Sequence, residues 1–463
     1  MKRLFKQNLK IIHLKTIIMA ANYNRTPVPM RNPEERINDW KEVVVGYTKE
    51  DTKTEASRCL GCKKPGCVPT CPAHIDIPGF ISELKKEQYT EAVSVILKRL
   101  PFPNICGRVC PHYCQGKCVK ARRGGELEIM ELKRSAITYS TEEDIKIDIA
   151  PDTGKKVAVV GSGPAGLAAS YFLRLKGHKV VVYEQKHKLG GMMILCIPPY
   201  RLRRDKLDED IDRIKRLGIE FRTNAKVDDI TTLKKEYDAV FVGIGTLKRK
   251  VLGIPGEDLI GVEHVIPYLE SINTFARKTI GKKVAVVGAG FSAMDAVRVA
   301  RRLGSEAFIV YRRSENEMPA APSEVEEAKE EGVTMMTLCN PTKIIGDENG
   351  KVKGIECIKM KLGEPDASGR AAPVPIPGSE FVIDCDMVIQ AISQGVETEC
   401  CKDVELSKWQ TLQVNDKFQT NVEGIYASGD CVTGPKSIVH AVGDTYVAVE
   451  AMHEYLMGKK NEE

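Results

Sequence analysis

The stretch KVAVVGSGPAGLAASYFLRLKGHKVVVYE, residues 156–184, joins two apolar runs through a glycine-rich turn and a helical pattern. Residues 156–160 and 179–183 predict buried strands, and the segment between them predicts a helix that Gly177 caps. In such a βαβ unit the first glycine permits the tight turn, the second lets backbone approach a pyrophosphate, and the third lets the helix pack on the strand. The helix N-terminus favours the negative charge of a dinucleotide. The candidate binding residues are Gly161, Ser162, Gly163, Pro164, Ala165 and Gly166.

A second unit of the same kind begins about 120 residues later. An apolar strand at 283–287 leads into a glycine turn, a helix and a strand at 307–311. Two further apolar runs, 238–244 and 386–392, predict buried strands, and Gly245 follows the first of them. Strands that alternate with helices predict an α/β fold with parallel sheets, here as two nested Rossmann-like domains. The candidate binding residues of the second turn are Gly288, Gly290, Phe291, Ser292 and Ala293.

The ends of the second strands distinguish the two units. Glu184 lies 23 residues after Gly161, with Gln185 beside it. An acid at this place can accept hydrogen bonds from an adenosine ribose and repels a 2′-phosphate, which favours FAD or NAD. The second unit instead ends in Arg312 and Arg313, whose guanidinium groups can bind a 2′-phosphate and therefore favour NADPH. The alternative for these arginines is an ordinary solvated strand end.

A third signal lies near the C-terminus, in the sequence GIYASGD at residues 424–430. A short strand that ends in Gly429-Asp430 can place a carboxylate beside the ribityl or pyrophosphate part of a flavin. The alternative is an ordinary aspartate in a turn. Together with Glu184 it favours FAD over NAD in the first unit.

Eight of the 15 cysteines fall in two groups of four ahead of the first glycine turn. Residues 34–150 carry helical patterns, including an amphipathic helix over Ile81–Leu100 that Pro101 and Pro103 end, and the second cysteine group falls mostly in loop. Four thiolates are the ligand set of an iron–sulfur cubane, and the alternative is a pair of structural zinc sites. The candidate metal ligands are Cys59, Cys62, Cys67, Cys71, Cys106, Cys110, Cys114 and Cys118.

The overall composition is ordinary for a globular protein. A chain of 463 residues predicts two or three domains. Its net charge of +6 is small for that length and gives no case for nucleic-acid binding. No apolar run approaches the roughly 18 to 20 residues that span a bilayer.

The N-terminus is basic, because residues 1–33 contain several Lys and Arg but no Asp or Glu. This pattern predicts a dispensable, disordered extension, with Met19 as the alternative start, or else an organelle-targeting sequence. Bunched cysteines in a long chain indicate a reducing compartment, and we expect the cytoplasm.

Together these motifs resemble the small-subunit family of NADPH-dependent glutamate synthase. Its relatives include flavoprotein subunits of ferredoxin:NADP transhydrogenase and sulfide dehydrogenase, and the N-terminal half of dihydropyrimidine dehydrogenase. The resemblance runs from about Arg31 to the C-terminus. It rests on Cys71–His74, Asn104–Pro111, Val157–Leu167, Gly190–Met192, Ile197–Leu202, Val287–Val297, Tyr311–Arg313 and Ile425–Asp430.

The resemblance implies FAD on the first Rossmann-like domain, NADPH on a second one inserted into it, and two [4Fe–4S] clusters in a helical N-terminal domain. Gly190 and Gly191 would let backbone approach the isoalloxazine ring, and residues 437–443 would begin a helix beside the flavin. The expected parts are 1–33 for the extension, 34–150 for the cluster domain, 151–250 with 380–463 for the FAD domain, and 251–379 for the NADPH domain.

The resemblance also implies two ligand sets. The first is Cys59, Cys62, Cys67 and Cys118, and the second begins with Cys71, Cys110 and Cys114. Relatives complete the second set with a Glu or Gln, but this chain has Lys133 at the matching position. A charged lysine cannot bind iron, so the fourth ligand is Cys106, Glu131 or neither.

The implied activity is electron transfer from NADPH through FAD and the clusters to a partner. We expect a hetero- or homo-oligomer, in which a large glutamate synthase subunit or another redox subunit is the partner. The alternatives are a transhydrogenase or sulfide dehydrogenase subunit, and a non-catalytic zinc-stabilised module. We assign no catalytic acid or base, because the cofactors carry this chemistry.

Overall fold

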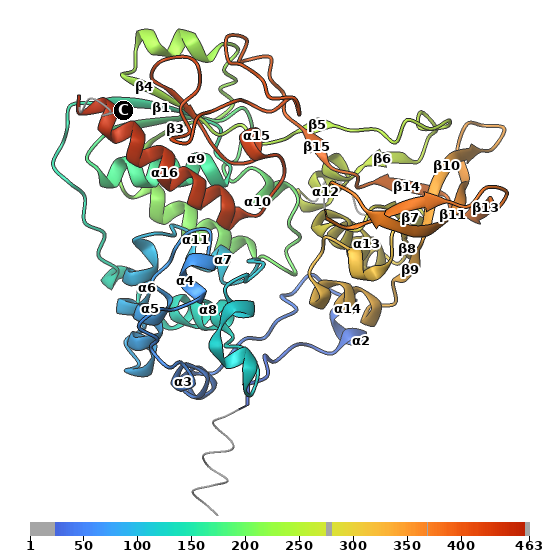
Figure 1. Ribbon diagram of the computed structural model, residues 1–463, viewed down its shortest axis with the longest axis horizontal. Helices are drawn as coiled ribbons and strands as arrows, with labels where there is room; N and C mark the ends of the chain where they lie inside the picture. The colour runs from blue at the N-terminus through green and yellow to red at the C-terminus, as the bar shows by residue number, and fades with distance from the viewer. Residues whose placement is uncertain (1–23, 275–279, 368, 459–463) are drawn as a thin grey trace, which may run out of the picture.

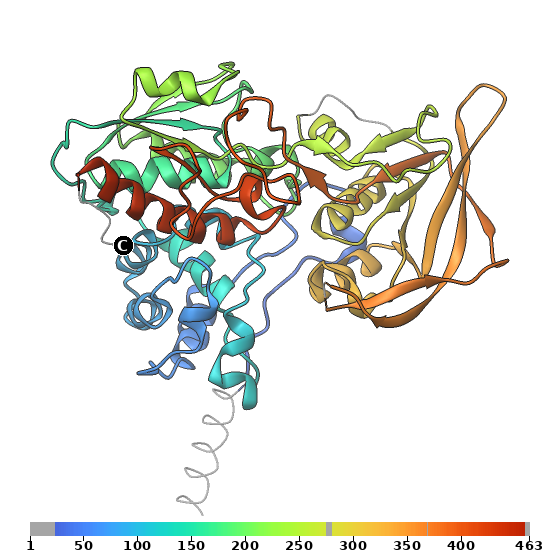
Figure 2. The same cartoon turned by 45° about the horizontal axis from the view of Figure 1, so that its top comes forward.

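The computed structural model describes residues 24–274, 280–367 and 369–458. Figures 1 and 2 show a helical N-terminal part, a first α/β domain packed on it, and a second α/β domain to one side. No helix within these described ranges is long and apolar enough to cross a bilayer.

The N-terminal part consists of short helices around one apolar core. The helices are α2 (Pro33–Arg36), α3 (Lys49–Ser57), α4 (Cys67–Thr70), α5 (Ile77–Lys85), α6 (Tyr89–Leu97), α7 (Pro103–Cys106) and α8 (Ile129–Tyr139). The prediction of a single helix over Ile81–Leu100 is wrong, because Glu87 adopts a left-handed φ of 62° and separates α5 from α6. This reversal lets α5 and α6 pack on each other and lets both contact α8.

The first α/β domain is built on a parallel sheet in the order β16-β4-β1-β2-β3. Its strands are β1 (Lys156–Val160), β2 (Lys179–Tyr183), β3 (Glu220–Arg222), β4 (Ala239–Val242) and β16 (Ile425–Ala427). Its helices are α9 (Pro164–Leu175), α10 (Met192–Leu195), α11 (Arg204–Lys215), α15 (Asp430–Thr433) and α16 (Ile438–Leu456). The predicted first βαβ unit is therefore confirmed, including the Gly177 cap with its φ of 85°.

The second α/β domain repeats this plan with a parallel sheet in the order β6-β14-β7-β8-β9. Its strands are β6 (Val262–His264), β7 (Lys283–Val287), β8 (Glu306–Tyr311), β9 (Thr334–Thr337) and β14 (Met387–Gln390), and its helices are α12 (Val265–Asn273), α13 (Phe291–Arg302) and α14 (Pro322–Glu330). Four antiparallel strands cover one end, namely β10 (Cys339–Gly346), β11 (Val352–Pro365), β12 (Ala371–Pro375) and β13 (Phe381–Asp384).

The chain passes between the two α/β domains through a two-stranded ribbon of β5 (Lys248–Arg249) and β15 (Gln394–Gly395). The prediction that the chain re-enters the first α/β domain at residue 380 is wrong, because β13 pairs with β11 and β14 pairs with β7. These backbone hydrogen bonds keep both strands in the second domain, so the return follows β14.

The segment before α3 packs on the protein over its described length. Arg25 forms ion pairs with Glu126 and Glu128, and the Thr26 amide donates to Glu55 over 2.9 Å. The prediction that the basic extension is disordered is therefore wrong for residues 24–33. Residues 1–23, which include Met19 and the targeting hypothesis, lie outside the described part of the chain.

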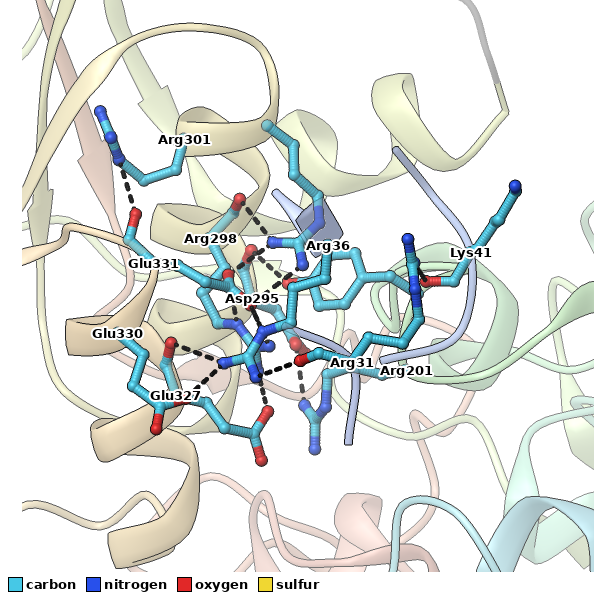
Figure 3. A network of polar contacts seen from close by, with 12 residues as sticks. Arg31, Arg36, Lys41, Arg201, Asp295, Arg298, Arg301, Glu327, Glu330 and Glu331 are labelled. Carbon is cyan, nitrogen blue, oxygen red and sulfur yellow. Dashed lines mark hydrogen bonds and ion pairs between the residues drawn. The ribbon is translucent and has the colours of Figure 1, made fainter. Parts of the chain in front are cut away.

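A buried ion-pair network joins this N-terminal segment to the second α/β domain (Figure 3). Glu331 follows α14 and accepts hydrogen bonds from Arg36 over 2.8 Å, from Arg298 over 2.7 and 2.9 Å, and from Arg302 over 2.6 and 3.0 Å. These side chains are at most 1% exposed. The Tyr200 ring, from the first α/β domain, lies 3.7 Å from the Arg302 guanidinium. Three parts of the chain thus share one network.

The change Glu331→Gln should lower the free energy of unfolding by about 3–5 kcal/mol, because it removes the carboxylate that pairs with buried Arg302 and one of the two that pair with Arg36 and with Arg298. Burial alone would raise the pKa of Glu331, but hydrogen bonds from Arg298 and Arg302 hold that pKa at about 2. The contribution of the carboxylate should therefore be present above about pH 4.5 and be lost as the pH falls toward 2. Urea unfolding at several pH values measures both effects. The exposed Glu326→Gln on α14 is the control, with a change under about 0.5 kcal/mol; an equal loss in both variants would contradict the role of the network.

Candidate cofactor-binding and cluster sites

The first glycine turn brings backbone close to backbone, as the sequence predicts. Gly161 has a φ of 95°, and a methyl group there would lie 2.6 Å from the carbonyl oxygen of Gly243. A methyl group at Gly166 would lie 1.8 Å from the carbonyl oxygen of Gly161, so α9 packs directly on the turn. Gly163, in contrast, faces space that is empty for at least 4 Å. The turn therefore leaves an open position at the N-terminus of α9.

Glu184 lies beside this turn, at the end of β2. One carboxylate oxygen accepts from the Ser162 amide over 3.0 Å and from the Ser162 hydroxyl over 2.6 Å. The other accepts from the Lys186 amide over 2.7 Å. These bonds fix the carboxylate at the strand end, where it can accept from ribose hydroxyls.

A cavity of about 500 Å³ opens at the carboxyl ends of β1, β2 and β4. Ten of the predicted residues line it: Gly161, Ser162, Gly163, Pro164, Ala165, Glu184, Gln185, Gly191, Gly245 and Asp430. Three further predicted residues, Gly166, Gly190 and Gly429, do not line the cavity but contact residues that do. The Gly190 amide, for example, donates to the Ser162 carbonyl over 3.0 Å. The crevice, the open Gly163 and the adjacent helix N-terminus fit an extended dinucleotide such as FAD.

Asp430 begins α15 and also lines this cavity, next to Gly429, which lies against Ala165 of α9. Its carboxylate accepts from the Lys436 amide over 3.1 Å, and burial raises its pKa to about 6. A carboxylate in this position can accept from the hydroxyl groups of a bound cofactor.

Sequence motifs missed part of the cavity wall. Residues 225–227 after β3, three residues after β15 (Glu397, Glu399 and Cys400), and Lys436 also line it; Ser437, the predicted start of a helix beside the flavin, does so as expected. The first two segments carry no recognisable motif, and folding brings them to the cavity.

The second glycine turn has the same form. Gly288 has a φ of 126°, and a methyl group there would lie 2.3 Å from the carbonyl oxygen of Ala391. Gly290 faces open space at the N-terminus of α13, and the next two residues, Phe291 and Ser292, are partly exposed. Ala293 is fully buried against the core. The turn therefore offers a second open position for a pyrophosphate.

The two arginines after β8 lie in different surroundings. Arg312 is exposed, whereas Arg313 is only 3% exposed. The Arg313 guanidinium donates to the Ala371 carbonyl over 2.8 Å and pairs with Asp366, in the hairpin of β11 and β12. Arg313 thus holds the hairpin, and Arg312 alone extends toward the solvent at this strand end.

Folding divides the eight cysteines differently from their order in the sequence. From here on, Cys59, Cys62, Cys67 and Cys118 are called the first cysteine group, and Cys71, Cys106, Cys110 and Cys114 the second. The first cysteine group surrounds a small pocket near the surface. Cys59, Cys62, Cys67 and Cys118 line it together with Ile77, Ile81 and Leu127. Burial raises the pKa of the Cys67 thiol to about 11. Leu60, next to this group, is 65% exposed, so the pocket lies close to solvent.

The second cysteine group is buried deeper. Cys71, Cys106 and Cys114 are at most 8% exposed, and Cys110 packs against the same core. Lys133 of α8 is 5% exposed and lies among these four cysteines. Among the residues that the structure describes, no three His, Cys, Asp or Glu side chains approach closely enough to hold one metal ion.

The second cysteine group lies against the first α/β domain. A methyl group at Gly443 of α16 would lie 2.1 Å from the carbonyl oxygen of Pro72, which follows Cys71. The Tyr113 ring packs edge-on against His440 with ring centroids 5.2 Å apart, and the first turn of α16 also lines the cavity. The second group therefore lies beside a helix that lines the cavity, whereas the first group lies close to solvent.

Two family models match successive parts of the chain. Residues 36–145 match dihydropyrimidine dehydrogenase domain II, 4Fe-4S cluster, and residues 155–445 match pyridine nucleotide-disulphide oxidoreductase. Among solved structures, FprA from Mycobacterium tuberculosis in complex with NADPH covers 66% of this chain and 85% of its own, with a TM-score of 0.58 at 20% identity. Thioredoxin reductase from T. acidophilum covers 65% and 99%, with a TM-score of 0.51 at 21% identity. These two similarities show the fold.

Fold and site together define a pyridine nucleotide-disulphide oxidoreductase that binds FAD and a nicotinamide nucleotide and carries an N-terminal 4Fe–4S domain. The glutamate synthase [NADPH] small chain of Escherichia coli is 31% identical over 96% of this chain and 99% of its own. NADPH-Fe(3+) oxidoreductase subunit beta of Geobacter sulfurreducens and NADP(+)-dependent formate dehydrogenase subunit beta of Moorella thermoacetica are each 38% identical, over 84% and 89% of this chain. The chain spans only 63% and 64% of the length of these two. It belongs to the family of glutamate synthase small chains and these related beta subunits.

The two open glycines allow a matched pair of variants. Gly163→Val should abolish flavin retention, because its side chain would fill the dinucleotide position without backbone strain at a φ of −70°. Gly290→Val makes the same change in the second domain, at a φ of −87°, and should keep the flavin while weakening nicotinamide nucleotide binding. Flavin absorbance per chain and nucleotide titration measure the two effects. Loss of flavin from Gly290→Val at an unchanged melting temperature would contradict the division of the two sites.

Proposed function

We propose that the protein takes electrons from NADPH and passes them, through FAD and two [4Fe–4S] clusters, to a partner subunit. When bound, NADPH supplies hydride, FAD accepts electrons in pairs and releases them singly, and the clusters carry single electrons. The observation that carries this proposal is the contact of Cys71-Pro72 with α16 at Gly443, because it sets the second cysteine group beside the flavin-sized cavity.

The protein's own groups bind and orient the cofactors. The N-terminus of α9 offers unbonded amides to the flavin pyrophosphate. Glu184 would accept from the adenosine ribose, and Asp430 from other hydroxyl groups of the flavin nucleotide. The exposed Arg312 would pair with the 2′-phosphate of NADPH. No proton transfer by a side chain is needed at these positions.

The different burial of the two cysteine groups indicates the order in which electrons would pass through them. The second group is the more buried and adjoins the cavity, whereas the first lies near exposed Leu60. We therefore place the second group as the entry to the cluster domain and the first as its exit toward the partner.

The partner belongs to the same proposal. The relatives are named small chains or beta subunits, which favours a multi-subunit assembly. One candidate partner is a large glutamate synthase subunit. The second candidate is another redox subunit, which the two relatives at 38% identity favour, since they are named for an NADPH-Fe(3+) oxidoreductase and a formate dehydrogenase. A transhydrogenase or sulfide dehydrogenase subunit belongs to this second class. Identification of the subunit that co-purifies with the native protein decides between them.

Anaerobic purification tests the function directly. We expect one FAD, about eight irons and about eight sulfides per chain, since two cubanes carry four of each. The protein should reduce artificial dyes with NADPH and show no glutamate synthesis by itself. A colourless protein that holds zinc in place of iron would contradict the proposal.

Arg312→Ala should weaken NADPH binding by about 10- to 100-fold, because a charge-assisted bond to phosphate contributes about 1.5–3 kcal/mol. NADH lacks the 2′-phosphate, so its affinity should stay nearly constant. Stopped-flow measurement of flavin reduction over a range of each nucleotide gives both affinities. Lys353→Ala, an exposed change on β11, is the control; equal weakening of NADPH and NADH by Arg312→Ala would reject the phosphate role.

A further inference from the structure

We propose that the second cysteine group is an all-cysteine cluster site, in which Cys106 supplies the fourth thiolate and the Lys133 ammonium is the buried countercharge of the cluster. This inference rests on the proposed function, since it presupposes that the group holds a [4Fe–4S] cluster. The chemistry of the donor set fits such a cluster, because soft thiolates are the ligands that its irons take.

Cys106 is buried beside the other three cysteines, at the junction of α7 and α8. It ends α7, is 0% exposed, and forms no disulfide. The Ile105 amide donates to the buried Asp210 carboxylate over 3.0 Å, which anchors α7 on the first α/β domain. A methyl group at Gly107 would lie 2.8 Å from the Cα atom of Arg134, so the end of α7 abuts α8 next to Lys133. The neighbours of the Cys106 thiol include Cys71, Cys110 and Lys133.

Glu131, the other candidate, lies on a different face of α8. Its carboxylate accepts from the Tyr47 amide over 3.0 Å and pairs with Arg134 over 3.7 Å, close to Gly46. Two residues along a helix of 3.6 residues per turn are about 200° apart, so Glu131 and Lys133 face nearly opposite directions. Since Lys133 lies among the cysteines, Glu131 is directed away from them.

Lys133 needs negative charge close by. Its side chain is 5% exposed, and no carboxylate among the described residues forms an ion pair with it. A buried ammonium without a countercharge costs several kcal/mol. The thiols of Cys110, Cys106, Cys114 and Cys71 lie around its side chain. Metal-bound thiolates are deprotonated, so a cluster held by these four cysteines supplies the missing charge.

A positive charge fixed beside a cluster favours the form with one more electron. Lys133 should therefore raise the reduction potential of the second cluster, the one that adjoins the flavin cavity. It acts here as a positioning residue, through charge, and it is not a ligand.

Cys106→Ala tests the ligand. Anaerobically purified protein should lose about four of about eight irons, the content of one cubane, while the flavin stays bound. Cys385→Ala is the matched control, because Cys385 is a buried cysteine (3% exposed) in the second α/β domain. Glu131→Gln should also keep all its iron. Full iron in Cys106→Ala, or loss of iron from Glu131→Gln, would overturn the assignment.

Lys133→Met tests the countercharge and does not depend on the folding of Cys106→Ala. The variant should keep its iron, and an EPR-monitored redox titration should show one cluster at a more negative potential. We expect at least a tenfold change in its reduced-to-oxidised ratio, which is about 59 mV for one electron. An unchanged potential, or loss of iron from Lys133→Met with full iron in Cys106→Ala, would overturn the inference. Wild-type protein without iron would instead reject the proposed function itself.

Discussion

The contact between Gly443 and Pro72 is the constraint on which the arrangement of the protein depends. The carbonyl of Pro72 occupies the space of the missing side chain, so α16 lies directly on the chain that follows Cys71. The same helix begins at the cavity with Ile438. One rigid helix thus connects the candidate flavin site with the buried cysteine group. Any side chain at Gly443 would separate the two domains between which the proposed function passes electrons.

The second α/β domain is held by a different kind of interaction. Its contact with the rest of the chain includes buried charges. Glu331 accepts hydrogen bonds from Arg36 and Arg298 (Figure 3). It also accepts from Arg302, whose guanidinium lies over the Tyr200 ring. Such pairs contribute less to net stability than apolar packing of the same volume, but each group requires its partners in one geometry. We therefore interpret the network as a device that fixes orientation, which matters because nucleotide and flavin must meet at the domain boundary.

Several features were predictable because they depend on local chemistry. The two glycine turns, their strands and the caps follow from φ angles and periodicity, and the structure has them where the sequence indicates. Others were not predictable. The break between α5 and α6 at Glu87 has no glycine or proline to mark it, and the return strand β14 resembles any buried strand. Arg313 follows Arg312 directly, yet alternation along the chain turns its side chain inward to Asp366.

The sequence by itself determined which chemical groups this protein has: two dinucleotide turns, an acid at one strand end and arginines at the other, and two sets of thiols. Spacing along the chain is enough for this, because each motif closes within one βαβ unit or one short loop. Only the tertiary structure decided which groups meet. It brings residues 225–227 and 397–400 to the cavity, Arg36 to Glu331, and Lys133 into the second cysteine group. Such contacts join residues far apart in the sequence, and they depend on how helices and sheets pack, which no local pattern specifies.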